Sequence, residues 1–452
     1  MNGGRYLTAL KRVVMNSRNV GRRDFLKSMS VAVLSGVSAP TLIARGALAN
    51  GQTPGANERI GVAGIGVGRR GSEIFAEAAR NPKTQPICVA DVWLPRAETI
   101  AQKNNCEIAY QDYRRVLERN DVDAITTATP EHWRGLVCIN ACLAGKHVYG
   151  EKPITLTINE GKLMEKAARR NNVVFQTGSQ QRSMRENYLG CEFIRNGGLG
   201  KIKEVIAANY ESPWLCNLPE QPIPDGLDWD TWCGPTPLVP YNIDLYTPRA
   251  KPGWLSFRPY SGGEMTGWGT HGFDQIQCAL GQDLTGPVEI NVEEGDGKLV
   301  PPIYTEAETA DRGNKICSRP RLSYKYANGI TVKLGDANRG GGIFIGENGK
   351  MEIFRGRITS NPAEMAIEIL KNERKSQSHI DNWLSCIMTG ERPISDIAIG
   401  RRSAAVCHLL NIARYLGRSL KWDPDNEVFV GDDEANTYLD REVRKGYELP
   451  EV

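Results

Sequence analysis

The 452-residue sequence predicts an α/β protein whose N-terminal part contains a doubly wound parallel sheet. Three observations predict this fold. Short apolar runs alternate with helical patterns from Arg59 to about residue 180, the connections between them are short, and a glycine-rich turn follows the first run. Strands and helices that alternate at these lengths are typical of a parallel sheet with helices on both faces.

The first strand and the first helix lie on either side of the glycine-rich turn. Residues 59–65 are an apolar run rich in β-forming side chains, and an amphipathic helix with apolar residues at positions 74, 75, 78 and 79 follows. Between them stand three glycines in GxGxxG spacing: Gly66, Gly68 and Gly71. They permit a tight turn, close approach of the backbone to a pyrophosphate, and close packing of helix on strand. Because amides at a helix N-terminus bind phosphates, the stretch predicts a dinucleotide site that includes Arg69.

The second strand places an acidic residue beside this turn. Residues 86–90 are apolar and end in Asp91, twenty positions after Gly71. A carboxylate at this place accepts hydrogen bonds from both hydroxyls of an adenosine ribose. It favours NAD over NADP, because a 2′-phosphate would meet its charge, but the nearby arginines at positions 69, 70 and 96 keep NADP open.

The alternation continues as far as residue 176. The predicted elements are a strand at 124–128 that ends in Thr129-Pro130, a helix at 133–144, a strand at 147–149 that leads into Glu151-Lys152-Pro153, a helix at 158–170 and a strand at 173–176.

Composition excludes several classes of function. Residues 1–49 carry eight Lys and Arg against one acidic residue, so the formal charge of +3 becomes −4 in the rest of the chain. Nothing in this distribution indicates a nucleic-acid partner. The eleven cysteines are odd in number and form no CxxC pair, so we expect neither a disulfide framework nor a metal site.

Residues 1–49 are typical of an export signal. A basic leader ends in RRDFLK at 22–27, a moderately apolar stretch follows at 28–43, and Ala47-Leu48-Ala49 forms an AxA-type cleavage site. The leader resembles a twin-arginine signal, with Gly21 where Ser or Thr is usual. Ser, Gly and Pro interrupt the apolar stretch, so it is a poor membrane span. We expect export by the twin-arginine translocase to a bacterial periplasm; an uncleaved anchor or a disordered leader is the alternative.

Four segments together make the sequence resemble a known family. They are GVGRRG at 66–71, TPEHW at 129–133, AGKHVYGEKP at 144–153 and GGEMTGWGTHGFD at 262–274. The sequence resembles the family of glucose-fructose oxidoreductase, inositol dehydrogenase and MocA, called Gfo/Idh/MocA, from Arg59 to Leu420. The resemblance implies a Rossmann domain at 59–180 and an α+β domain at 181–425 on a large, open, mostly antiparallel sheet, followed by a tail at 426–452. It also implies assembly through that sheet, as a homodimer or homotetramer.

The second half of the sequence agrees with such a domain. The predicted strands are residues 202–210, 287–292, 321–326, 330–334 and 342–346, with turns at Asn328-Gly329 and Asn348-Gly349, and helices follow at 379–389 and 395–416. A passage rich in Trp and Pro at 213–259 predicts a long loop over a cleft. Its tryptophans either pack the loop, which we expect for most of them, or form a platform for a sugar.

Oxidation of a carbinol with NAD requires a base near the cofactor ring to take the hydroxyl proton. Lys152 follows the C-terminal end of a strand, where the clefts of such sheets open. In the family the Lys of the EKP motif binds the substrate hydroxyl beside the nicotinamide, and the resemblance implies that role for Lys152. We expect these residues to contact the cofactor: Gly66, Gly68, Arg69, Gly71, Asp91, Thr129, Pro130, His132, Glu151 and Lys152.

His271 is the second candidate for proton transfer. Members of the family commonly carry Asp and His four residues apart on one helix face, but the position four residues before His271 is Gly267. Asp274 lies on the same predicted helix face and could orient the imidazole, or Glu264 could supply the carboxylate. Gln180 and Arg182 follow the last strand of the first domain and are candidate substrate contacts, together with Asp274.

These features predict an exported NAD(P)-dependent oxidoreductase that acts on a sugar, cyclitol or glycoside. Because the periplasm holds no pool of free nicotinamide cofactor, we expect the nucleotide to stay tightly bound. One alternative is a glycoside hydrolase or lyase that uses bound NAD for transient oxidation and elimination. Another is a non-catalytic module that binds a nucleotide or a sugar, which the absence of the family's Asp leaves open.

Overall fold

The structure is a computed structural model that describes residues 59–248, 253–295, 297–306, 310–374 and 377–452. These residues belong to one unit that spans residues 55–452. The predicted export signal at 1–49 lies outside the described residues. Within the described ranges, no helix has the length and apolar character that crossing a membrane requires.

The first part of the structure is built on six parallel strands. They are β1 (Ile60–Ile65), β2 (Thr84–Ala90), β3 (Ile108–Tyr110), β4 (Ala124–Thr127), β5 (His147–Gly150) and β6 (Phe175–Thr177). Their order is β3-β2-β1-β4-β5-β6, which confirms the predicted doubly wound sheet. The direction of winding reverses between β1 and β4, and a crevice for a ligand opens at such a reversal, beyond the carboxyl ends of the strands.

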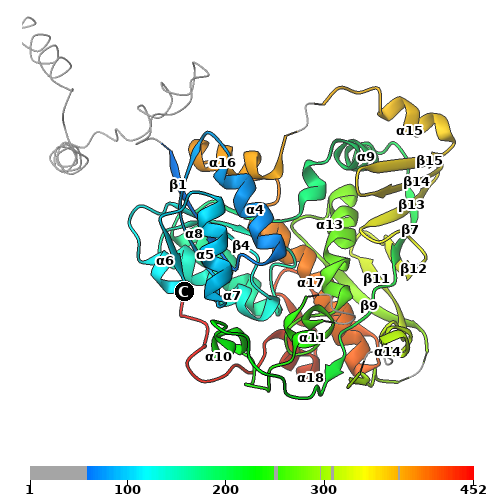
Figure 1. Ribbon diagram of the computed structural model, residues 1–452. Helices are drawn as coiled ribbons and strands as arrows, with labels where there is room; N and C mark the ends of the chain where they lie inside the picture. Colours follow the sequence, from blue (N-terminus) through cyan, green and yellow to red (C-terminus); the bar gives the residue numbers. More distant parts are fainter. Residues whose placement is uncertain (1–58, 249–252, 296, 307–309, 375–376) are drawn as a thin grey trace, which may run out of the picture. The chain divides into compact units, whose positions relative to one another are not determined.

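Helices cover both faces of this sheet (Figure 1). They are α4 (Arg69–Ala79), α5 (Leu94–Lys103), the short α6 (Arg114–Leu117), α7 (Glu131–Leu143) and α8 (Ile158–Arg170). Because both faces are covered, β1 is buried along its whole length, as expected for a parallel strand with an unbroken apolar sequence. The helix α4 packs Ile74, Phe75 and Ala78 against the sheet.

The second part is built on a nine-stranded sheet. Its strands are β7 (Ile202–Ala208), β9 (Pro287–Glu294), β11 (Arg321–Tyr326), β12 (Thr331–Gly335), β13 (Gly341–Gly346), β14 (Lys350–Phe354), β15 (Arg357–Asn361), β16 (Leu420–Asp423) and β17 (Val428–Phe429). The order is β15-β14-β13-β7-β12-β11-β9-β16-β17, and only the pair of β7 and β12 is parallel. This mostly antiparallel sheet confirms the second half of the predicted fold class. Two further strands, β8 (Leu215–Cys216) and β10 (Ile303–Tyr304), pair with each other.

Helices pack on one face of the nine-stranded sheet. The longest are α9 (Arg185–Arg195), α13 (Gly269–Leu280) and α17 (Ile397–Leu416), whose buried side chains share one core with the strands. The remaining helices are η4 (Gln180–Ser183), α10 (Trp229–Cys233), α11 (Ile243–Tyr246), η5 (Trp254–Ser256), α12 (Glu264–Gly267), α14 (Ala310–Cys317), α15 (Ala363–Ile369), α16 (His379–Thr389), α18 (Asp433–Asn436) and η7 (Thr437–Leu439). In Figure 1, α17 lies between the two sheets and contacts α8 on one side and α13 on the other.

The end of the chain packs against the first part of the structure. The sequence predicts a polar tail from residue 426, but these residues form β17, α18 and η7 and then follow the Rossmann part as far as Val452. Arg441 binds the buried carboxylate of Glu160 at 3.1 Å, and Tyr447 packs edge-on against Trp133. A segment with little apolar content is therefore held by ion pairs and by single aromatic contacts.

Candidate active site

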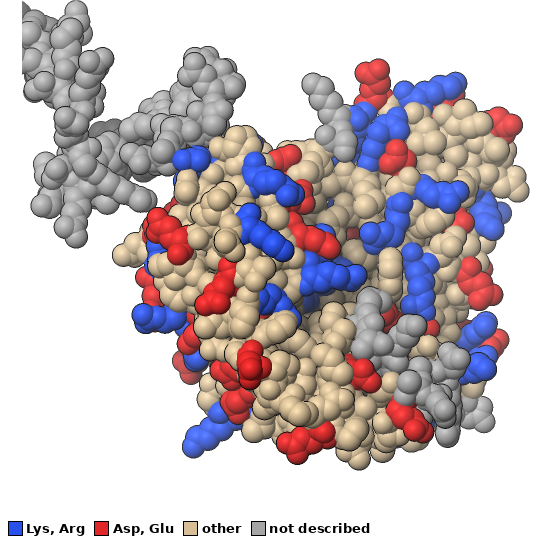
Figure 2. All heavy atoms as spheres, in the orientation of Figure 1, with Lys and Arg blue, Asp and Glu red and all other residues tan. Residues whose placement is uncertain are grey.

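A pocket of about 950 Å³ opens where the carboxyl ends of the parallel strands face the second part of the structure. Its lining combines the glycine turn after β1, the ends of β2, β4 and β5, and residues of η5, α13 and the turn between β14 and β15. Figure 2 shows a hollow in the surface with Lys and Arg side chains around it. The pocket is thus shared by the two halves that the sequence predicts to bind nucleotide and substrate.

The glycine turn has the shape that a pyrophosphate requires. Gly66 has a φ of +70°, and a Cβ at Gly71 would lie 2.0 Å from the Gly66 carbonyl oxygen. A Cβ at Gly68 would instead meet only the Arg96 side chain, at 3.6 Å, so the space that it would occupy belongs to the pocket. The first amides of α4 have no side-chain cap. Four predicted residues, Gly66, Gly68, Arg69 and Gly71, line the pocket here and fit a dinucleotide.

Asp91 lies at the end of β2, where a ribose is expected. It is 6% exposed, and burial raises the pKa of its carboxyl while Arg96, 3.5 Å away, opposes this rise. Arg96 also donates to the Tyr246 hydroxyl at 2.6 Å and stacks over the rings of Trp93 and Tyr246. The carboxylate and the guanidinium therefore lie side by side in the lining of the pocket.

Glu151 fixes the loop that carries Lys152. Its carboxylate is buried and accepts hydrogen bonds from Arg70 at 2.8 Å and from Gln180 at 2.7 Å. It also accepts a hydrogen bond from the Lys152 backbone amide at 3.1 Å. Glu151 and Gln180 line the pocket as predicted, and their hydrogen bonds join β5 to the start of η4. This network holds Lys152 at the pocket.

Lys152 and His271 line the same pocket, together with Thr129 and Pro130 from the end of β4. The Lys152 amine donates to the backbone carbonyl of Gly267 at 3.0 Å. The carbonyl of the residue that replaces the family's Asp thus holds the amine. His271 lies in the first turn of α13, one turn beyond this contact.

His132 does not line the pocket, which corrects the expectation that it contacts the cofactor. Its ring is completely buried between Trp232 and Tyr260, and its Nε2 lies 2.9 Å from the Trp232 carbonyl. Burial lowers the pKa of His132 to about 3. The helix α7 begins at residue 131, and its first turn directs Trp133 to the pocket and His132 into the core.

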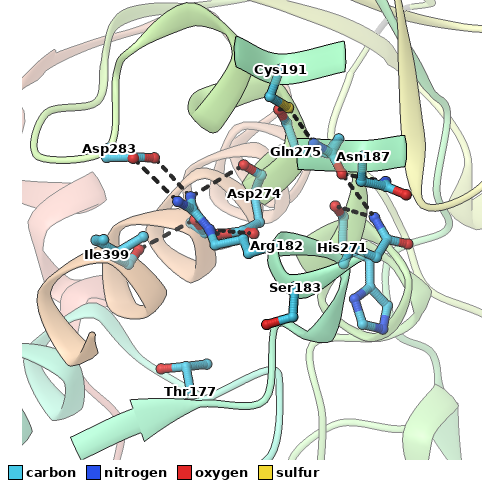
Figure 3. A network of polar contacts seen from close by, with 12 residues as sticks. Thr177, Arg182, Ser183, Asn187, Cys191, His271, Asp274, Gln275, Asp283 and Ile399 are labelled. Carbon is cyan, nitrogen blue, oxygen red and sulfur yellow. Dashed lines mark hydrogen bonds and ion pairs between the residues drawn. The ribbon is translucent and has the colours of Figure 1, made fainter. Parts of the chain in front are cut away.

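Arg182 and Asp274 also lie outside the pocket, which corrects their assignment as substrate contacts. Arg182 donates to Asp274 at 2.8 Å and to Asp283 at 2.7 Å, and Ser403 donates to Asp274 at 2.8 Å. Figure 3 shows Arg182 joined to Asp274 and Asp283, with the His271 ring pointing away from them. The Asp274 carboxylate is thus occupied by Arg182 and Ser403 and ties η4, α13 and α17 together.

Several residues in the lining have no counterpart among the predicted site residues. Trp268 and Arg355 border the pocket on the side of His271, and Tyr246 borders it beside Arg96. Trp268 belongs to the segment 262–274 that carries the family resemblance, so its position was readable from the sequence. Arg355 had no such signal, because neither β14 nor β15 was predicted.

The passage 213–259 packs mainly against itself. Trp229 and Trp232 stack at 4.4 Å, and Trp214 is buried against Phe257 and Tyr304. Trp232 and Trp254 also reach the pocket lining. The expectation that most of these tryptophans pack the loop is confirmed.

Two family descriptions match the chain. "Oxidoreductase family, NAD-binding Rossmann fold" matches residues 59–179, and "Oxidoreductase family, C-terminal alpha/beta domain" matches residues 201–449; both belong to Gfo/Idh/MocA. The predicted cofactor, NAD, is confirmed by the first of these matches.

Relatives with known activities match part of the chain. A dTDP-3,4-didehydro-2,6-dideoxy-alpha-D-glucose 3-reductase of Saccharopolyspora spinosa is 28% identical over 223 residues, which are 47% of this chain and 58% of the relative. A scyllo-inositol 2-dehydrogenase (NAD(+)) of Bacillus subtilis is 33% identical over 101 residues, 22% of this chain and 30% of the relative. The chain thus spans less than two thirds of the length of these relatives.

Solved structures share the fold over most of the chain. Aldose-aldose oxidoreductase from Caulobacter crescentus, complexed with glycerol, has a TM-score of 0.55 at 16% identity and covers 80% of this chain and 99% of its own. Levoglucosan dehydrogenase in complex with NADH and levoglucosan has a TM-score of 0.55 at 16% identity and covers 83% of this chain and 100% of its own. With both domains matched in order and the nucleotide turn in place, the chain belongs to the Gfo/Idh/MocA oxidoreductase family.

Proposed function

We propose that the protein is an NAD(P)-dependent oxidoreductase that oxidises a hydroxyl-bearing carbon of a sugar, cyclitol or glycoside. One observation carries this proposal. The same pocket is lined by the glycine turn and Asp91 at one end and by Lys152 and His271 at the other. The names of several relatives, among them an inositol dehydrogenase and a levoglucosan dehydrogenase, support a polyol substrate.

The bound nucleotide supplies the acceptor for the hydride of the carbinol carbon. The protein has to orient that carbon and accept the hydroxyl proton. Lys152 is held by its backbone amide on Glu151 and by its amine on the Gly267 carbonyl. This placement lets the amine hydrogen-bond a substrate hydroxyl and polarise its O–H bond. His271 borders the same space and is the group that we assign to carry the proton away.

Export and assembly are further parts of the proposal. The twin-arginine motif at 22–23 and the AxA site at 47–49 support export to the periplasm by the twin-arginine translocase. Since this route carries folded proteins, NAD can be loaded before export and stay bound. Homodimers or homotetramers would form through the face of the nine-stranded sheet opposite α13, where Ile343 and Ile345 are only half-buried.

A second candidate function is redox-neutral cleavage of a glycoside. Two observations favour it: similarity to a Glycosyl hydrolase family 109 protein of Shewanella pealeana, 26% identical over 218 residues, and Gly267 at the position of the family's Asp. In such a reaction, transient oxidation acidifies a neighbouring C–H bond, the glycosidic substituent leaves, and the oxidation is then reversed. The two functions differ in whether reduced cofactor accumulates.

The experiment begins with the protein as isolated from the exporting cell. Mass spectrometry of the native and of the denatured protein identifies the nucleotide, and a panel of sugars and cyclitols is then followed at the nicotinamide absorbance. We expect NAD that leaves only on denaturation and a bound cofactor that one class of sugar reduces. Cleavage of an aryl glycoside without net NADH would favour the second function instead. A protein that binds nucleotide but neither oxidises nor cleaves any sugar would refute both.

A further inference from the structure

The turn between β14 and β15 places an arginine at a position that turn chemistry does not favour. Arg355 and Gly356 have φ values of +28° and +77°. Asn, Asp or Gly normally occupy the first position of such a two-residue hairpin, because a longer L side chain is strained at positive φ. A strained residue that persists beside a ligand pocket points to a functional role for its side chain.

The same turn is tied to the helix that carries His271. The Gly356 amide donates to the Asn187 side chain at 2.5 Å, and Asn187 donates to Gln275 at 2.5 Å. Asn187 is completely buried, and Gln275 follows His271 by one turn of α13. Figure 3 shows Asn187 and Gln275 joined beside that helix. The position of Arg355 is therefore set relative to the proposed proton-transfer residue.

The Arg355 side chain belongs to the lining of the pocket. It lies over the Trp268 ring at 5.1 Å, and the same ring is 5.9 Å from the imidazole of His271. Stacking on an indole uses the face of the guanidinium and leaves its N–H groups directed outward. Among the described residues, no carboxylate lies within ion-pair distance of Arg355.

The charges of the pocket are divided unevenly along its length. The carboxylates of its described lining are those of Glu73, Asp91 and Glu151, and each lies beside an arginine of the first domain. At the substrate end, position 267 is Gly, so the carboxylate that the family carries there is absent. Lys152 and Arg355 bring positive charge to this end. This positive charge does not attract a neutral polyol, whereas it attracts an anionic substrate.

We propose that Arg355 binds a carboxylate of the substrate, so that the preferred substrates are sugar acids such as hexuronates. The inference rests on the proposed function and narrows its substrate class. The planar fork of a guanidinium matches a carboxylate with two parallel hydrogen bonds. Since the Trp268 ring contacts both Arg355 and His271, a carboxylate held by Arg355 would place the rest of the substrate in the pocket that His271 and Lys152 line.

The test compares matched ligands with and without the charge. Binding of galacturonate, galactose and galactose 6-phosphate is measured by calorimetry on the protein loaded with NADH, which cannot accept hydride from them. Turnover of each by the protein loaded with NAD is followed at the nicotinamide absorbance. We expect galacturonate to bind at least 10-fold more tightly than galactose. Arg355→Gln should weaken galacturonate binding roughly 10- to 100-fold, because it removes a charge-assisted hydrogen-bonded pair. Galactose binding should change by less than about 2-fold.

Arg357→Gln is the matched control, because Arg357 belongs to the same hairpin, is exposed, packs over Phe354 and lies outside the pocket lining. It should change neither affinity. Equal binding of galactose and galacturonate, or an equal loss of both in Arg355→Gln, would overturn the inference. If galactose 6-phosphate binds more tightly than galacturonate, the carboxylate assignment is overturned and Arg355 binds a phosphate instead. Because binding is measured without turnover, these outcomes stay distinct from failure of the proposed oxidation, which would appear as absent turnover with every sugar.

Discussion

Lys152 has its backbone and its side chain fixed by different parts of the structure. The amide is held by Glu151 from the first domain, and the amine is held by the Gly267 carbonyl from α12. A lysine side chain has considerable rotamer freedom, so fixing both ends of the residue costs conformational entropy. The contact to the Gly267 carbonyl oxygen uses one of the three donors of the amine.

Lys152→Ala should abolish turnover without loss of the nucleotide. The substitution removes the amine that polarises the substrate hydroxyl, and positioned proton-transfer groups contribute about 10²- to 10⁴-fold to rate. The glycine turn and Asp91 are untouched, so the amount of NAD recovered after denaturation should equal that of the unchanged protein. The measurement pairs kcat on the best sugar with nucleotide content.

Lys166→Ala is the control for that experiment, because Lys166 is exposed on α8. Its turnover should match that of the unchanged protein. If Lys152→Ala retains full turnover, the amine has no part in the chemistry, and the proton-transfer role proposed for Lys152 is wrong.

Three predicted site residues show what the sequence does not reveal at the scale of single residues. His132, Arg182 and Asp274 have suitable chemistry and stand beside the right motifs, yet each is buried among protein partners. The motifs locate a segment at the cleft, but one helical turn decides which side chain faces the ligand. For Arg182 the deciding partner, Asp283, is a hundred residues away in the sequence.

At the scale of elements, local pattern predicted what local sequence determines. The strands β11 and β13 and the helix α16 agree with the predicted ranges within a residue, because alternation, glycine turns and caps lie within each segment. The strands β14 and β15 were not predicted, although the sequence has the Asn348-Gly349 turn and alternates polar and apolar residues from 350 to 353. Arg355 was missed together with them.

The C-terminal segment shows the same limit for a polar sequence. Its order comes from partners that only the fold brings together: Arg441 pairs with Glu160 and donates to the His132 carbonyl at 2.7 Å. Arg444 donates to the Gly234 carbonyl at 2.8 Å and pairs with Asp230. A segment without apolar periodicity was therefore predicted as a tail, although it holds α7, α8 and α10 together.

Arg441→Ala should lower the free energy of unfolding by about 2 kcal/mol, since it leaves the buried carboxylate of Glu160 without its ion-pair partner. Urea titrations followed by tryptophan fluorescence measure the change. Lys445→Ala alters an exposed cation in the same segment and should shift the result by less than about 0.5 kcal/mol. Equal effects of the two substitutions would show that the segment contributes no specific contact.

At the scale of the whole molecule, the chain returns to its first domain after building the second. The helix α16 packs Trp383 against Tyr149, and α17 joins the cores of both sheets. Buried histidines form hydrogen bonds where the two parts meet. The ring of His132 contacts Trp232, and the ring of His408 contacts Thr155. The ring of His379 contacts both Ser183 and Thr177. No sequence pattern identifies such contacts, because each contact joins residues that are far apart in the chain.

These histidines make the fold sensitive to acid. Burial lowers the pKa of His132 to about 3 and that of His379 and His408 to about 4, against about 6.5 for an exposed ring. As the pH falls below 6.5, the unfolded chain binds these protons before the folded chain does. Their contribution to stability is therefore complete above pH 6.5 and is lost as the pH falls toward 4.

Glu131 opposes this trend in the same range. Burial raises the pKa of its carboxyl to about 7, so the folded chain binds that proton first as the pH falls. Among these four groups the three histidines outweigh the one carboxyl, so their summed contribution to stability falls between pH 6.5 and 4.5. His408→Gln should be less stable than the unchanged protein at pH 7.5, yet its stability should fall less steeply with acid, by up to about 1.4 kcal/mol for each pH unit. Urea unfolding at half-unit pH steps measures both slopes, and parallel curves would show that the pKa of His408 is the same in the folded and the unfolded chain.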